Sequence, residues 1–324
     1  MATGEKPDPS KIQQGQTAMA DVPDERLAKI ASILKPKKTT YTKVAILDTP
    51  GLMVDDRKDN PRRLGILREG NGIVVVLDEL GADLADQPAA QRRPAFADTE
   101  PVANRIPKLE AGLKKNKPVK EREADEIEIA LLKRVVASLE AGVPASQQNL
   151  TEDEEKTLRG FQLLTLKPEV VFVNRGDSGF SDPLPADLLA LAPKAMQAPV
   201  KLEMELAQLG DDDRAAFMAD LGLAKFHRDE VIRGIFYGVG REAFFTVGED
   251  ECRTWSIPKG CEAVEAAGCI HKDLSEKFVR ANVIGFDDFV ARGYPEGSQD
   301  PRPEPHRRED LPREGRGHHA HLCC

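Results

Sequence analysis

Residues 43–52 join a short apolar run to the tetrapeptide Asp-Thr-Pro-Gly. An aspartate at the end of a strand can hold Mg²⁺, usually through water, and a glycine three residues later lets a backbone N–H come close to a phosphate. We therefore predict a metal contact at Asp48 and a phosphate contact at Gly51. The structural alternative is a strand that runs into an ordinary Pro-Gly turn.

A second polar pair, with the spacing Asn-x-x-Asp, follows the apolar run 170–173. The amide of Asn174 can tie neighbouring loops together, and the carboxylate of Asp177 can accept two hydrogen bonds from the edge of a guanine base. A turn is again the alternative, because Asn, Gly and Asp are typical turn residues. Two such patterns in order, each after an apolar run, indicate a nucleotide site more strongly than either alone.

Three β-branched runs must position these side chains, namely residues 44–47, 73–77 and 170–173. Each is almost continuously apolar, which is typical of a strand covered on both faces of a parallel sheet. Each ends in a polar residue, and these residues are Asp48, Asp78 and Asn174. Since ligands of open α/β sheets bind beyond the carboxyl ends of the strands, the sequence predicts an α/β fold with its site at that edge.

Residues 98–163 have a helical pattern and little strand signal. Apolar residues recur at spacings of three and four around Leu109 and again around Leu132, which predicts two helices. Residues 114–118 interrupt the pattern, so we expect an antiparallel hairpin with a basic tip formed by Lys114, Lys115, Lys117 and Lys120. The spacing of a capping box at 151–154 should start the helix that returns to the sheet.

The last part of the chain changes character twice. Residues 244–291 alternate apolar and polar positions around an Ala-rich helical segment, which predicts a small α+β domain. Residues 292–324 are rich in Pro, Arg, Glu and His, so we expect a disordered tail. The predicted organisation has five parts, at 1–97, 98–163, 164–243, 244–291 and 292–324.

Composition restricts the class of protein. The 324 residues carry a formal charge of −9, with 31% charged and 40% hydrophobic residues, which is typical of a globular chain. No apolar run approaches the roughly 20 residues of a spanning helix, and no signal-peptide pattern opens the chain, so we expect no membrane and a cytoplasmic location. The net negative charge argues against nucleic-acid binding by the surface as a whole. Binding through a local basic patch remains an alternative.

The Asp-Thr-Pro-Gly segment and Trp255 also carry a resemblance to a known family. Further segments that carry it are residues 22–27, 35–38, 161–168, 201–205, 266–271 and 278–284. Through them the chain resembles the YchF family, a branch of the Obg-related translation-factor NTPases, over about residues 18–291. The resemblance implies a P-loop NTPase fold, or G domain, with an inserted α-helical hairpin, followed by a C-terminal TGS domain of β-grasp type. It also implies Mg²⁺ with ATP or GTP, nucleotide hydrolysis and association with ribosomes.

Carried over residue by residue, the resemblance assigns Asp48 to Mg²⁺, Gly51 to the γ-phosphate, Asn174 and Asp177 to the base, and Lys201 to the loop that packs on the base. It assigns no catalytic residue. The family's phosphate-binding loop, GxxxxGK[ST], should precede Val22, but no Gly-Lys pair occurs in the 324 residues. That loop supplies a backbone cradle, a lysine on the phosphates and a hydroxyl on Mg²⁺. We therefore expect an incomplete G domain and a partial TGS-like domain.

Two functions remain from the sequence. The first is a YchF-like ATP- or GTP-binding NTPase associated with the ribosome, weak or inactive because the phosphate-binding loop is absent. The alternative is a nucleotide-independent module that binds ribosome or RNA through the helical hairpin and the TGS-like domain. Whether the chain is an enzyme is therefore open at this point.

Overall fold

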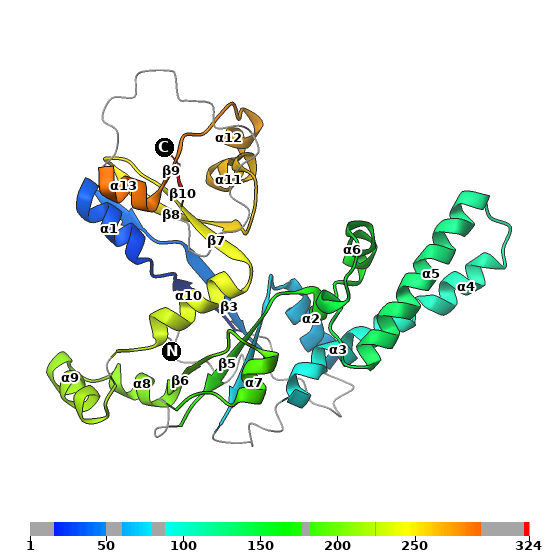
Figure 1. Ribbon diagram of the computed structural model, residues 1–324, viewed down its shortest axis with the longest axis horizontal. Helices are drawn as coiled ribbons and strands as arrows, with labels where there is room; N and C mark the ends of the chain where they lie inside the picture. Colours follow the sequence, from blue (N-terminus) through cyan, green and yellow to red (C-terminus); the bar gives the residue numbers. More distant parts are fainter. Residues whose placement is uncertain are drawn as a thin grey trace. The chain divides into compact units, whose positions relative to one another are not determined.

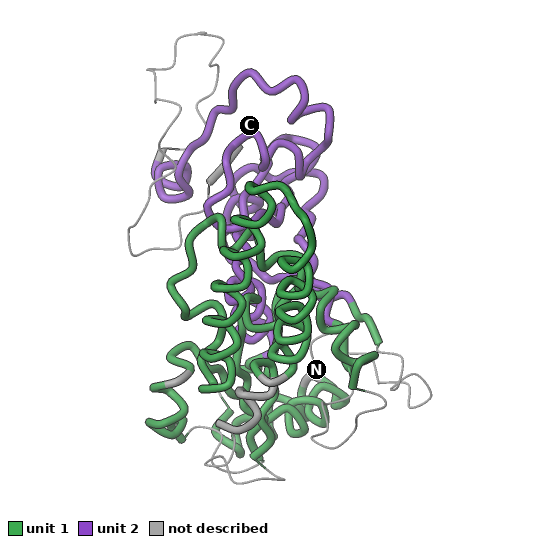
Figure 2. The backbone as a smooth tube through the Cα atoms, turned by 90° about the vertical axis from the view of Figure 1, so that its right-hand side faces the viewer, with its two compact units in different colours: residues 1, 3–18, 47–227 green, residues 2, 19–46, 228–324 purple. Residues whose placement is uncertain are grey.

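The computed structural model describes residues 16–49, 60–79, 88–176, 182–223, 225–292 and 321–323. The chain divides into two compact units, which Figure 2 colours separately. Unit 1 comprises residues 1, 3–18 and 47–227, and unit 2 comprises residues 2, 19–46 and 228–324. Unit 2 is therefore assembled from two stretches of chain, with most of unit 1 between them in the sequence.

A parallel three-stranded sheet forms the centre of unit 1. Its order is β4-β5-β6, with β4 at Ile73–Asp78, β5 at Glu169–Asn174 and β6 at Met196–Ala198. The register places Asp78 opposite Asn174, and Asn174 opposite Ala198, so the three strands end at one edge. Leu77, Val171 and Val173 pack beneath α7 (Ala186–Leu191), and this confirms the predicted α/β class.

Two of the three apolar runs are less buried than their sequences predict. β3 (Lys43–Asp48) pairs with β1 (Gln16–Asp21), and none of its residues is buried. Among the described strands β4 is an edge, and its Val76 side chain is 61% exposed. The prediction of strands covered on both faces is therefore wrong for β3 and β4. It is correct for β5, in which four consecutive residues, 170–173, are buried and therefore both faces are covered.

The helices of unit 1 connect these strands and form an extension beside the sheet (Figure 1). Their bounds are α2 (Asn60–Glu69), α3 (Pro88–Ala103), α4 (Ile106–Leu113), α5 (Val119–Glu140), α6 (Glu152–Leu158), α8 (Val200–Leu206) and α9 (Asp211–Asp220). Three 3₁₀ turns are η3 (Ala145–Gln147), η4 (Arg159–Phe161) and η5 (Leu164–Leu166).

The predicted helical hairpin is formed by α4 and α5, which meet at residues 114–118. Leu109 of α4 and Leu132 of α5 belong to one buried apolar cluster, and Lys133 pairs with Glu110 across the hairpin at 2.8 Å. The predicted capping box also forms at the start of α6. There the Thr151 hydroxyl accepts from the Glu154 N–H at 3.3 Å, and the Glu154 carboxylate accepts from the Thr151 N–H at 2.9 Å.

Unit 2 contains a mixed five-stranded sheet of order β2-β8-β7-β10-β9. The strands are β2 (Lys38–Thr40), β7 (Arg241–Thr246), β8 (Glu251–Pro258), β9 (Val283–Gly285) and β10 (His321–Cys323). The helices are α1 (Glu25–Leu34), α10 (Arg228–Gly238), α11 (Ala263–Ile270), α12 (Lys272–Glu276) and α13 (Phe286–Arg292). Strands β7 and β8 form an antiparallel hairpin, in agreement with the predicted α+β character.

Both faces of this sheet are covered. On one face Leu27 and Ile30 of α1 pack against Phe245, Cys252 and Phe289. On the other face Phe244 and Ile257 pack with Cys261 and Ala266. Because α1 supplies two of the five buried residues of the first cluster, residues 19–46 belong by their contacts to unit 2, whereas the sequence places them in the first part of a G domain.

Part of the predicted tail lies within the described residues. Residues 321–323 form β10, which pairs in parallel with β7 and antiparallel with β9. The prediction of disorder is wrong for these three residues, because the backbone of β10 fills the position between two strands that would otherwise be unpaired there. It is also wrong for Arg292, which ends α13. Residues 293–320, also predicted to be disordered, lie outside the described residues.

Within the described ranges, no helix combines the length and the apolar character needed to cross a bilayer.

Candidate functional site

The carboxyl edge of the β4-β5-β6 sheet is organised by the side chain of Asn174. Its Nδ2 donates to Asp78 Oδ1 at 3.4 Å, and its Oδ1 accepts from the Val200 N–H at 3.3 Å. Asp78 ends β4, Asn174 ends β5, and Val200 begins α8. The amide therefore joins three neighbouring segments, which is the tying role predicted for it from the sequence.

An ion pair between the buried Arg175 and the partly exposed Glu79 fixes the backbone that follows Asn174. The Arg175 side chain is 5% exposed, and its Nη1 lies 3.0 Å from Glu79 Oε1. The other oxygen of Glu79 accepts from the Gly176 N–H at 3.3 Å, and the Arg175 N–H donates to the Ala198 carbonyl at 3.0 Å. Residues 174–176 are thus held from both β4 and β6. A fixed backbone at this point would pre-organise a binding loop.

Glu79 and Arg175 were not predicted from the sequence. Each stands next to a residue that was singled out, since Glu79 follows Asp78 and Arg175 follows Asn174. Their pairing depends on the register of β4 against β5, which places Asp78 opposite Asn174. The signal in the sequence is that each of the two strand ends is followed by a further charged residue. Once the two strands are paired, these charged residues can be expected to meet.

The remaining predicted site residues are distributed unevenly. Lys201 lies in the first turn of α8 with an exposed side chain, directly after the Val200 N–H that Asn174 binds. Asp48 is exposed at the end of β3, which belongs to a different sheet from β4-β5-β6. Gly51 and Asp177 lie outside the described residues. The described contacts therefore bring together Asn174 and the start of α8, and they do not join Asp48 to this group.

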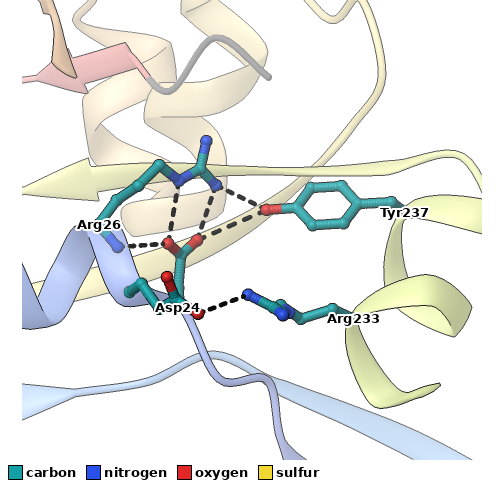
Figure 3. Close-up of polar contacts among 5 residues, drawn as sticks. Asp24, Arg26, Arg233 and Tyr237 are labelled. Atoms are coloured by element: carbon teal, nitrogen blue, oxygen red, sulfur yellow. Dashed lines mark hydrogen bonds and ion pairs between the residues drawn. The ribbon is translucent and has the colours of Figure 1, made fainter. Parts of the chain in front are cut away.

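A second polar cluster, in unit 2, is built around Asp24 (Figure 3). Asp24 caps the start of α1 by accepting the Arg26 N–H at 2.9 Å, and it accepts Arg26 Nη2 at 2.7 Å. The same nitrogen donates to the Tyr237 hydroxyl at 2.6 Å, and Arg233 pairs with Glu25 at 3.4 Å. Burial raises the pKa of the Tyr237 phenol. This cluster connects α1 with α10, two helices of unit 2 that are far apart in the sequence.

The Asp24 cluster gives a structural role to the motif at residues 22–27. Asp24 is 7% exposed, and the Arg26 guanidinium lies 5.3 Å from the centroid of the Phe245 ring. The charge of Asp24 is thus matched by Arg26 within the same turn, and the hydroxyl of Tyr237 completes the arrangement. Aspartate is a common residue at the start of a helix, whereas the partner on α10 is not a local signal in the sequence.

The relatives found by comparison with known proteins share one family name. A family model described as "YchF-GTPase_C: Protein of unknown function (DUF933)" matches residues 242–302. The "Ribosome-binding ATPase YchF" of Pasteurella multocida is 30% identical over 288 residues, covering 85% of this chain and 79% of the relative. The protein of the same name from Bacillus subtilis is 26% identical over 305 residues, covering 87% and 82%.

A solved structure shows the same fold. This structure, titled "Structure of the Schizosaccharomyces pombe YchF GTPase", superposes on the present chain with a TM-score of 0.72 at 23% identity. The match covers 85% of this chain and 79% of that chain. The likeness to this protein concerns the arrangement of helices and strands. Together with the match to the Pasteurella protein over most of both sequences, it leads to one conclusion: the chain belongs to the YchF family.

Proposed function

We propose that this chain binds ATP or GTP at the carboxyl edge of β4-β5-β6 and associates with the ribosome. The observation that carries the proposal is the side-chain amide of Asn174, which joins Asp78 to the Val200 N–H. Binding at the carboxyl ends of parallel strands is the rule for open α/β folds. The relatives from Pasteurella multocida and Bacillus subtilis are named ribosome-binding ATPases.

In this proposal Asn174 and Asp177 recognise the base, and Lys201, in the first turn of α8, lies beside it. Gly51 brings a backbone N–H to the γ-phosphate. Asp48 is suited to hold Mg²⁺, because its carboxylate is exposed. Mg²⁺ is usually held by one or two carboxylates together with waters and substrate phosphates. When bound, the ion would neutralise charge on the phosphates.

We propose weak hydrolysis or none. The 324 residues contain no GxxxxGK[ST] motif, so the lysine and hydroxyl that this motif directs at the phosphates and Mg²⁺ have no counterpart in the sequence. Leu52 stands where many related enzymes use glutamine to orient water. Nucleotide binding would then depend more strongly on the base contacts than in an enzyme with a complete phosphate site.

The domain organisation is part of the proposal. The resemblance implies a G domain at residues 1–97 and 164–243, interrupted by the hairpin at 98–163, with an incomplete TGS-like domain of β-grasp type at 244–291. We propose this division except for residues 19–46 and 228–243, which pack in unit 2. The mixed sheet formed by β7, β8 and their neighbours supports the last assignment. We propose a cytoplasmic location, since ribosomes are the expected partner.

The test is a titration of the purified chain with fluorescent ATP and GTP, with and without Mg²⁺. The Asn174→Ala variant should lose most of the binding, because it removes both contacts at the strand ends. Asn104→Ala, an exposed asparagine beyond the end of α3, is the matched control and should bind like the original chain. If the original chain binds neither nucleotide, the proposed nucleotide site is wrong.

One observation favours the alternative of a nucleotide-independent RNA-binding or ribosome-binding module. At the hairpin tip, the side chains of Lys114, Lys115 and Lys120 are exposed, while Lys117 pairs with Asp125 at 2.5 Å. Exposed lysines near one another are suited to contact with RNA phosphates. In unit 2, the stacking of Arg253 on Trp255, with 4.2 Å between the guanidinium carbon and the ring centroid, offers a further surface for bases.

Ribosome co-sedimentation separates the two functions. Replacing Lys114 and Lys115 together by alanine should weaken binding and reduce its salt dependence, because two phosphate contacts are lost. Replacing Lys108 and Lys194, two exposed lysines of unit 1 away from the tip, removes the same charge and should have little effect. Binding that is unaffected by nucleotide would support the module, whereas binding that requires nucleotide would support the NTPase.

A further inference from the structure

Glu203 is a buried carboxylate in α8. Its side chain is 2% exposed, and Oε1 accepts two hydrogen bonds from His227, one from the backbone N–H at 2.8 Å and one from ring Nδ1 at 2.7 Å. A carboxylate can only accept, so the ring nitrogen is the donor. The second oxygen, Oε2, is buried and has no hydrogen-bond partner among the described residues. Burying a carboxylate costs free energy, so a role beyond space-filling is indicated.

Glu203 lies one turn from the Val200 N–H that binds Asn174. The backbone N–H of Glu203 donates to the Pro199 carbonyl at 3.0 Å and thereby closes the first turn of α8. This turn presents two groups of the candidate site, the Val200 N–H and the exposed Lys201. A shift of Glu203 would therefore move both groups relative to the end of β5.

Among the described residues, α8 also packs through its apolar side chains. The helix has seven residues, and its apolar side chains Leu202 and Leu206 pack with Leu223 in a small cluster. Apolar contacts are non-directional, and a short helix can slide or rotate on them. The two bonds to His227 are directional and join α8 to the last residue of unit 1 before the chain returns to unit 2.

We propose that Glu203 is a positioning residue for the first turn of α8, beside the proposed base-recognition site at Asn174. Through its two bonds to His227, Glu203 fixes the first turn of α8, so that the Val200 N–H meets Asn174 Oδ1 and Lys201 stands beside the base. The inference rests on the proposed nucleotide site for its functional meaning, while the mechanical coupling from His227 through Glu203 to Val200 stands on the contacts alone.

Hydrogen exchange tests the coupling without nucleotide. In the Glu203→Ala variant, amides at the start of α8, Val200 included, should exchange about tenfold faster than in the original chain, the effect expected from losing the bonds that hold the turn. Glu203→Gln keeps an acceptor oxygen and should restore slow exchange. Glu205→Gln changes an exposed carboxylate of the same helix and is the matched control. If Glu203→Ala leaves Val200 exchange unchanged, the proposal is wrong.

Ligand binding tests the functional meaning. The affinity for fluorescent ATP and GTP should fall about tenfold in Glu203→Ala and His227→Ala, while the affinity for inorganic tripolyphosphate should stay unchanged, because that probe has no base. An equal loss for both probes would contradict a role in base recognition. If the original chain binds no nucleotide, the proposed function fails, and the exchange experiment still decides whether Glu203 positions α8.

Discussion

Asp98 binds Thr165 twice through one carboxylate oxygen. Oδ2 accepts from the Thr165 N–H and from its hydroxyl, both at 2.8 Å, while Oδ1 accepts from the Leu164 N–H at 3.0 Å. Asp98 lies in α3 and is fully buried, and Thr165 lies in the 3₁₀ turn η5 that precedes β5. The start of the helical extension is therefore fastened to the chain that enters the sheet.

The Asp98→Asn variant should destabilise unit 1 by about 1–3 kcal/mol, because an amide nitrogen would face a backbone donor in place of an acceptor. Chemical denaturation measures this free energy of unfolding. Glu100→Gln removes a charge from an exposed position of the same helix and should change stability little. Equal stability of the two variants would show that the bonds of Asp98 are not important.

The Glu79→Ala variant should cost about 1–3 kcal/mol, since it leaves the buried guanidinium of Arg175 without this carboxylate. The estimate is moderate because the Glu79 side chain is 33% exposed. The same substitution should weaken nucleotide binding by loosening residues 174–176. Glu69→Ala, at an exposed position at the end of α2, is the control. Unfolding curves measure the stability, and the fluorescent titration measures nucleotide affinity. If Glu79→Ala has the same stability and affinity as Glu69→Ala, both expectations are wrong.

Tyr237→Phe should destabilise unit 2 by about 1 kcal/mol, because Arg26 loses the hydroxyl at 2.6 Å while Asp24 stays paired. Tyr41→Phe is the matched control, since it makes the same chemical change in another residue of unit 2. Thermal or chemical unfolding followed by near-UV signals compares the variants. An unchanged midpoint for Tyr237→Phe would mean that Asp24 and Arg26 hold α1 without help from α10.

The stability difference between the original chain and the Tyr237→Phe variant should depend on pH. Burial raises the pKa of the Tyr237 phenol in the folded chain, relative to about 10 in the unfolded chain. The folded state therefore favours the protonated phenol, and its stabilisation is complete below about pH 10 and is lost as the pH rises through the folded-state pKa. Measuring the unfolding free energy of both chains from neutral to alkaline pH checks this. If the difference in unfolding free energy between the two chains stays constant across that pH range, the expected contribution of the Tyr237 phenol is wrong.

The structure separates what local sequence predicts from what it cannot. The capping box of Thr151 and Glu154 and the hairpin around residues 114–118 were predicted because their signals involve neighbours in the sequence. The exposure of Val76 was not predicted, since it depends on which elements of the fold cover that face of the sheet. A run of β-branched residues gives the preference for a strand but not its place in the sheet.

The candidate site shows the same division. Asn174 was singled out from its position after an apolar run, and its amide joins the ends of β4 and β5 to the start of α8. Glu79, Glu203 and His227 were missed because each gains its meaning from a partner that the fold supplies. The partner of Arg26 on α10 lies 211 residues away in the sequence. Such pairings are set by tertiary packing, which no local pattern encodes.

The division of unit 2 into two stretches has a consequence for synthesis of the chain. Leu27 and Ile30 leave the ribosome early, but their apolar partners Phe245, Cys252 and Phe289 follow only after unit 1 has been made. At typical elongation rates of about 5–20 residues per second, this delay is on the order of 10–40 s. During that interval α1 has an uncovered apolar face, so unit 1 should fold first and unit 2 should close around α1 afterwards.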